Sequence, residues 1–116
     1  MSQFISLSEA VAMTTLYRTN REAILDSYYQ NQNILPLSES FEREVFDEIL
    51  SHTGCVGIRV YFGMDENNKV HVIFVGYNSE DEDMVTETNS LTEGDEIAER
   101  GVRCPDICPP SSPLNS

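Results

Sequence analysis

Residues 55–77 restrict the fold of this chain more than any other segment. Apolar residues alternate along 55–62, a run rich in Asp and Asn follows at 64–68, and 70–77 is again apolar. A period of two residues predicts strands, and Asp and Asn favour the turn between them. The segment therefore predicts an antiparallel β-hairpin. The side expected to be buried consists of Val56, Ile58, Val60, Phe62, Val70, Val72 and Phe74.

A long helix is predicted ahead of the hairpin. Ser6 and Glu9 match a capping box, and apolar residues recur beyond them at helical spacing. This pattern predicts an amphipathic helix over about 7–29. Thr and Asn residues weaken the helical preference near position 19, so a break at that point is an open alternative.

A second helix is predicted over about 38–52. Ser38 has the character of an N-cap, and two apolar rows follow it. Gly54 ends the pattern. We therefore expect an α+β fold with two N-terminal helices packed on one face of a small antiparallel sheet centred on the hairpin, and with a Pro-rich C-terminal strap.

Length and charge limit the classes of function. The 116 residues predict one domain, with residues 1–103 as its body, 78–103 as an acidic segment and 104–116 as a tail. The net charge of −13 disfavours nucleic acid and anionic membranes and favours a basic protein partner. The N-terminus lacks a signal peptide pattern, and no apolar run suits a membrane span. We expect a cytoplasmic protein with reduced thiols.

The C-terminal tail combines two cysteines with four of the five prolines. Proline lacks the backbone N–H, so this segment cannot continue a helix or join a central strand. Cys104 and Cys108 are spaced for a small disulfide ring, for half of a metal site or for a structural anchor. A metal would need further ligands, for which Cys55 and His52 are the candidates. These alternatives stay open, and we assign no cofactor.

One face of the hairpin carries the other candidate site. Arg59, Tyr61, His71 and Tyr77 are expected to project from the less apolar side. Arginine and aromatic residues dominate binding hot spots, and His71 could act as a general base. The simpler alternative is an ordinary solvated face on which Arg59 pairs with an acid from the chain's C-terminal part.

Three short motifs resemble those of a group of small, uncharacterised bacterial proteins. They are Leu35-Pro-Leu-Ser-Glu-Ser-Phe41, the strand Gly54-Cys-Val-Gly-Ile-Arg-Val-Tyr-Phe-Gly-Met-Asp65, and the closing Arg103-Cys-Pro-Asp-Ile-Cys-Pro-Pro110. The similarity extends over nearly the whole chain. It implies a self-contained domain and carries over no catalytic residue.

The leading hypothesis is a non-enzymatic acidic interaction module that binds a basic protein. One alternative is a small metal or thiol–disulfide protein that uses Cys55, Cys104 and Cys108. A second alternative is an enzyme that uses the face of Arg59, Tyr61 and His71, although no known catalytic motif is present. The hairpin edge also leaves dimerisation by strand pairing open.

Overall fold

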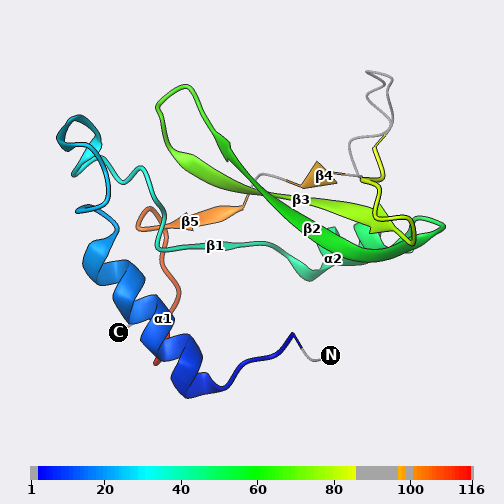
Figure 1. The fold of residues 1–116 in the computed structure, drawn as a ribbon, viewed down its shortest axis with the longest axis horizontal. Helices are drawn as coiled ribbons and strands as arrows, with labels where there is room; N and C mark the ends of the chain where they lie inside the picture. The colour runs from blue at the N-terminus through cyan, green and yellow to red at the C-terminus, as the bar shows by residue number, and fades with distance from the viewer. Residues whose placement is uncertain (1–2, 86–96, 99–100, 116) are drawn as a thin grey trace.

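The computed structural model describes residues 3–85, 97–98 and 101–115, and it has an α+β fold (Figure 1). A three-stranded antiparallel sheet has the order β2-β3-β4, and a two-stranded sheet pairs β1 with β5. In chain order the elements are α1 (Leu7–Asn20), the 3-10 helix η1 (Ser27–Tyr29), β1 (Ser38–Ser40), α2 (Arg43–Ser51), β2 (Cys55–Met64), β3 (Val70–Asn78), β4 (Ile97–Ala98) and β5 (Val102–Cys104).

The predicted hairpin is confirmed. Strands β2 and β3 pair antiparallel, with Val60 opposite Phe74. The connecting turn is built by Asp65, whose Oδ1 accepts hydrogen bonds from the backbone N–H groups of Asn67 at 2.8 Å and Lys69 at 3.0 Å. The local chemistry of the Asp-Asn run therefore forms the turn that the sequence predicts.

Helix α1 is shorter than the predicted 7–29. Ser6 caps it as expected, since its hydroxyl accepts the backbone N–H of Glu9 at 3.1 Å. The helix ends at Asn20, which lies at the break that Thr and Asn residues suggested. There Thr19 and Asn20 bond the carbonyls of Thr15 and Leu16 through their side chains. Such side-chain bonds compete with continued helical hydrogen bonding.

The prediction of a helix beginning at Ser38 is wrong. Residues Ser38–Ser40 form β1, which pairs with β5, and α2 begins only at Arg43 with Glu42 as its N-cap. Local N-cap preference gives way here to a pairing partner more than sixty residues later in the chain. The helix ends before Gly54, whose φ of 91° only glycine adopts easily.

Only α2 packs on the hairpin as predicted. Ile49 is buried against the backbone of Gly76 in β3, and α2 contacts both β2 and β3. Phe74 anchors an aromatic cluster, with ring centroids 4.7 Å from Phe41 and 5.1 Å from Phe46. Helix α1 instead lies beside the C-terminal segment, away from the hairpin (Figure 1).

The molecule is open, and few of its side chains are fully buried. Val56, Val60 and Phe62, which were expected in the core, are exposed. The pairing register of β2 shifts beside Val56, between Cys55 and Gly57, and Val60 and Phe62 lie further from Gly76, where α2 packs. The radius of gyration is 16.3 Å, against about 13 Å for a compact chain of this length. Among the residues whose burial the structure describes, the buried apolar ones are Ile34, Ile49, Val75 and Cys104.

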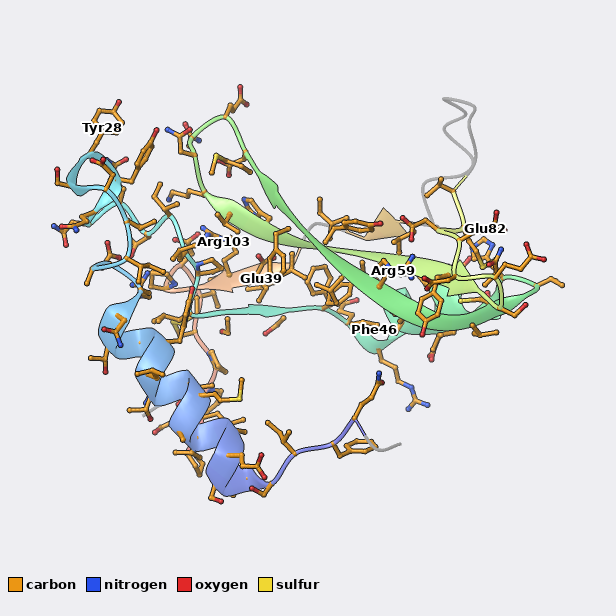
Figure 2. All side chains as sticks on the ribbon, viewed as in Figure 1. Tyr28, Glu39, Phe46, Arg59, Glu82 and Arg103 are labelled. Atoms are coloured by element: carbon orange, nitrogen blue, oxygen red, sulfur yellow. A yellow bond between two sulfur atoms is a disulfide. The ribbon has the colours of Figure 1, made fainter. Side chains whose placement is uncertain are left out.

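Arg103 connects the two sheets. Its side chain is buried and lies near Glu39, its register partner in β1 (Figure 2). Nη2 donates to the carbonyls of Ile34 at 3.2 Å and Val70 at 2.9 Å. Glu39 Oε1 accepts the backbone N–H of Val72 at 2.9 Å, so both side chains bond to backbone at the start of β3.

Parts of the acidic segment predicted over 78–103 lie outside the described residues, namely 86–96 and 99–100. Of its described parts, Ile97–Ala98 extends the hairpin sheet as β4, and β5 reaches into the predicted tail, since it includes Cys104. No helix among the described residues is long and apolar enough to cross a membrane.

Candidate functional site

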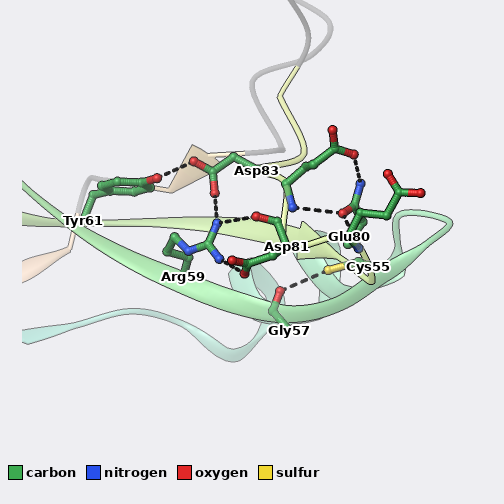
Figure 3. Close-up of polar contacts among 9 residues, drawn as sticks. Cys55, Gly57, Arg59, Tyr61, Glu80, Asp81 and Asp83 are labelled. Carbon is green, nitrogen blue, oxygen red and sulfur yellow. Dashed lines mark hydrogen bonds and ion pairs between the residues drawn. The ribbon is translucent and has the colours of Figure 1, made fainter.

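The Arg59 cluster consists of Arg59, Tyr61, Tyr77, Asp81 and Asp83 and occupies one face of the hairpin (Figure 3). The guanidinium of Arg59 lies over the ring of Tyr77, with Cζ 4.8 Å from the ring centroid. It donates hydrogen bonds to the carboxylates of Asp81 and Asp83. The hydroxyl of Tyr61 donates to the other oxygen of Asp83.

The loop after β3 delivers the two acids to Arg59. The side-chain oxygen of Asn78 accepts the backbone N–H groups of Glu80 and Glu82, both at 3.0 Å. Asp81 adopts a φ of 65°, which turns the chain back towards the sheet. Residues 79–83 are therefore held against the hairpin. The alternative in which Arg59 pairs with an acid of the chain's own C-terminal part matches this arrangement.

Hydrogen bonding shifts the pKa values within the Arg59 cluster. Bonds from Tyr61 and then Arg59 lower the pKa of Asp83, because they stabilise its charged form. The same bond raises the pKa of Tyr61, whose proton Asp83 holds. The bond to Asp83 also raises the pKa of Arg59. The one basic side chain of β2 is thus engaged by two acids, and the cluster holds one more carboxylate than cation.

The structure places His71 apart from the Arg59 cluster. The register puts it opposite Gly63, four residues along β2 from Arg59, which is about 13 Å at 3.3 Å per residue. His71 Nε2 lies 2.7 Å from Asp65 Oδ2, and its Nδ1 lies 4.0 Å from the buried carboxylate of Glu39. The four residues predicted for this face share one side of the hairpin but form two separate groups.

Asp65 is expected to stabilise the hairpin in a pH-dependent way. Its hydrogen bond to His71, with the N–H groups of Lys69 and Asn67, lowers its pKa to about 2, against about 3.9 in the unfolded chain. A lowered folded-state pKa adds stability above about pH 4, which is lost as the pH falls through about 2. Urea unfolding measured from pH 5 down to pH 2 should show this loss.

Asp65→Asn is the control for that titration. It keeps an oxygen for the turn but removes the titrating carboxyl, so the loss of stability between pH 4 and pH 2 should become smaller. An unchanged pH profile in Asp65→Asn would show that other carboxyls cause the loss. An NMR titration of Asp65 gives its pKa directly.

The three cysteines do not come together. Cys104 and Cys108 form a disulfide with a Cα–Cα distance of 4.6 Å, which is one of the alternatives that their spacing left open and differs from the expected reduced thiols. Cys55 is a free thiol at the start of β2, where its sulfur donates to the Gly57 carbonyl at 3.3 Å. Within the described residues no group of three or more His, Cys, Asp or Glu side chains is arranged to hold a metal. His52, Cys55, Cys104 and Cys108 are thus not assembled as one set of ligands.

The disulfide borders a hollow between α1 and the C-terminal segment. The hollow has a volume of about 290 Å³ and is lined by residues that include Tyr17, Leu37 and Pro109. Arg18 Nη1 donates to the Leu114 carbonyl at 2.7 Å, and this bond ties the tail to the helix.

Comparison with protein-family models, with curated proteins and with solved structures finds no significant match for the chain.

Sequence reasoning missed Glu39, Asp81, Asp83 and the buried Arg103 as partners in these groups. Their spacing carries no motif, because each meets its partner only through the fold. The one available signal was Arg59, a lone charge within an apolar strand, which requires a counter-charge from elsewhere in the chain.

Proposed function

We propose that this protein is a non-enzymatic acidic interaction module that binds a basic protein partner. The observation that carries the proposal is the acidic surface of α2, formed by Glu42, Glu44, Asp47 and Glu48. All four side chains are exposed. Glu44, Asp47 and Glu48 recur at helical spacing on one side of α2.

The acidic surface of α2 is held on a rigid base. Phe46 and Ile49, on the opposite side of the helix, pack against the hairpin. Arg43 pairs with Asp47 on this surface, but acids outnumber it, so the surface suits a cluster of Lys or Arg side chains, for which it provides electrostatic complementarity and fast association.

Crowding of acids at the start of α2 supports the same function. Hydrogen bonding with Glu42, and its negative charge, raise the pKa of Glu44. A bound cationic side chain would relieve this repulsion, so binding should lower the pKa of Glu44. We therefore expect a basic partner to stabilise the acidic surface of α2.

The test begins with capture of partners at low and high salt, followed by binding measurements with the purified partner. The triple variant Glu44→Gln, Asp47→Asn, Glu48→Gln should weaken binding roughly tenfold or more at low salt and reduce its salt dependence. The matched control is Glu66→Gln, Glu80→Gln, Asp106→Asn, which removes three exposed acids elsewhere and should have a much smaller effect. Equal weakening by both triple variants, or no salt-sensitive partner at all, would contradict the proposal.

The disulfide favours a second candidate, a small thiol–disulfide protein. Cys104 is buried in β5 and Cys108 is exposed in the tail, so the bond joins the body of the protein to its end. Disulfides are commoner in oxidising compartments, so the cytoplasmic location stays a prediction. Elemental analysis, together with spectra before and after reduction, tests this candidate and its metal-binding form. The enzyme alternative has less support, because His71 and Arg59 belong to separate groups.

A further inference from the structure

The outer edge of β2 has unused hydrogen-bonding groups. The N–H of Val70 bonds to the carbonyl of Ile34, and the N–H of Val72 bonds to the side chain of Glu39. At these two residues the backbone N–H and C=O groups of β3 therefore point away from β2. In an antiparallel pair, opposite residues point their backbone groups either both inward or both outward. Phe62 lies opposite Val72, so its backbone groups point outward from β2.

The same alternation turns the backbone groups of Ile58 and Val60 to the outer edge. Among the described residues no hydrogen bond reaches these groups, and β2 is an end strand of its sheet. A long strand edge without Pro, Lys or a covering element is a template for pairing with another strand.

Apolar side chains accompany this edge. Val60 is 45% exposed, Phe62 74% and Met64 63%. The only charged residue of β2 is Arg59, and Asp81 and Asp83 already bind it. Pairing here would cover apolar surface without removing an unpaired charge from water.

We propose that a second copy of this chain pairs with the β2 edge, antiparallel and centred on Val60. The first argument is charge. Residues 49–64 contain no Asp or Glu in a chain of net charge −13, so this edge is where two copies meet with the least repulsion. A basic strand would find no acid within β2, and the two acids beside it, Asp81 and Asp83, already bind Arg59.

The second argument is the near-palindrome of β2 about Val60. In a two-fold antiparallel pair centred there, Gly57 lies opposite Gly63, Ile58 opposite Phe62 and Arg59 opposite Tyr61 of the second copy. Small residues meet small ones, and apolar residues meet apolar ones. Shifting the centre to Arg59 would place the two arginines directly opposite each other, which destabilises a sheet. The resulting assembly is one continuous sheet through both copies.

Sedimentation velocity over a range of concentrations tests the dimer. The wild-type chain should shift from monomer to dimer as concentration rises. Val60→Lys should remain monomeric, because it places two like charges opposite each other at the centre. The matched control Leu16→Lys makes the same change at an exposed apolar residue of α1 and should dimerise like the wild type. A wild-type chain that is monomeric throughout, or a Val60→Lys variant that dimerises equally well, would overturn the proposal.

Oxidative cross-linking tests the register. In a Cys55→Ser background, Val60→Cys should form a covalent dimer with copper–phenanthroline. The two residues at the centre form a hydrogen-bonded pair with Cα atoms about 5.5 Å apart, within disulfide range. Phe62→Cys lies two residues from the centre in each copy, about 13 Å from its equivalent, and should cross-link no more than Leu16→Cys. Equal cross-linking of the three variants would overturn the centred register.

The dimer rests on different residues from the proposed binding of a basic partner, so the two proposals can be tested independently. Val60→Lys leaves the acidic surface of α2 unchanged and should retain salt-sensitive partner binding. The acidic-surface triple variant leaves the β2 edge unchanged and should still dimerise.

Discussion

Replacing Ile49 by alanine is expected to destabilise the protein by about 3 kcal/mol. Ile49 is only 2% exposed, it is the largest fully buried side chain in the described part of the chain, and it holds α2 against Gly76 in β3. Its removal leaves a cavity at the one place where a helix packs on the hairpin. Urea unfolding followed by circular dichroism measures the change.

Leu50→Ala is the matched control for Ile49→Ala. It lies next along the same helix but is 48% exposed, so its loss should cost less than about 1 kcal/mol. Equal destabilisation by the two variants would show that α2 does not pack through Ile49.

Arg103→Met is expected to cost about 3 kcal/mol, for a different reason. Methionine keeps much of the side-chain volume but donates no hydrogen bond. The carbonyls of Ile34 and Val70 would then lose the donor that joins the two sheets.

Arg43→Met is the control for Arg103→Met, because it removes the same charge from an exposed position. Its side chain makes an ion pair with Asp47 at the helix surface, and such a pair contributes under about 1 kcal/mol. Both variants can be compared by their urea midpoints. An Arg103→Met protein as stable as Arg43→Met would mean that the link between the sheets contributes little.

Sequence reasoning succeeded where the interactions are local. The hairpin follows from alternation along 55–77, and its turn follows from Asp65, which bonds residues two and four positions away. The Ser6 cap is likewise a contact within one helical turn. The predicted end of the first helix, at about residue 29, was wrong. Helix α1 ends at Asn20, where Thr19 and Asn20 form side-chain hydrogen bonds that compete with continued helix.

The candidate site was predictable only in part. Arg59, Tyr61 and Tyr77 lie together because alternation alone places them on one face of the hairpin. The acids that engage Arg59 come from a loop whose return depends on Asn78 and on the positive φ of Asp81. Sequence pattern does not reveal where such a loop returns, so the acidic segment predicted over 78–103 carried no sign of which acids would reach Arg59.

By itself, then, the sequence determined the hairpin, the start of α1 and the strongly acidic character of the chain. Only the tertiary structure decided that Ser38–Ser40 pairs with Val102–Cys104 and that Arg103 is buried beside Glu39. Periodicity reports which side of an element is apolar, but it does not say which distant element will cover it. Arg103 reaches Ile34 across 69 positions of the chain, and only the folded backbone brings that donor and acceptor together.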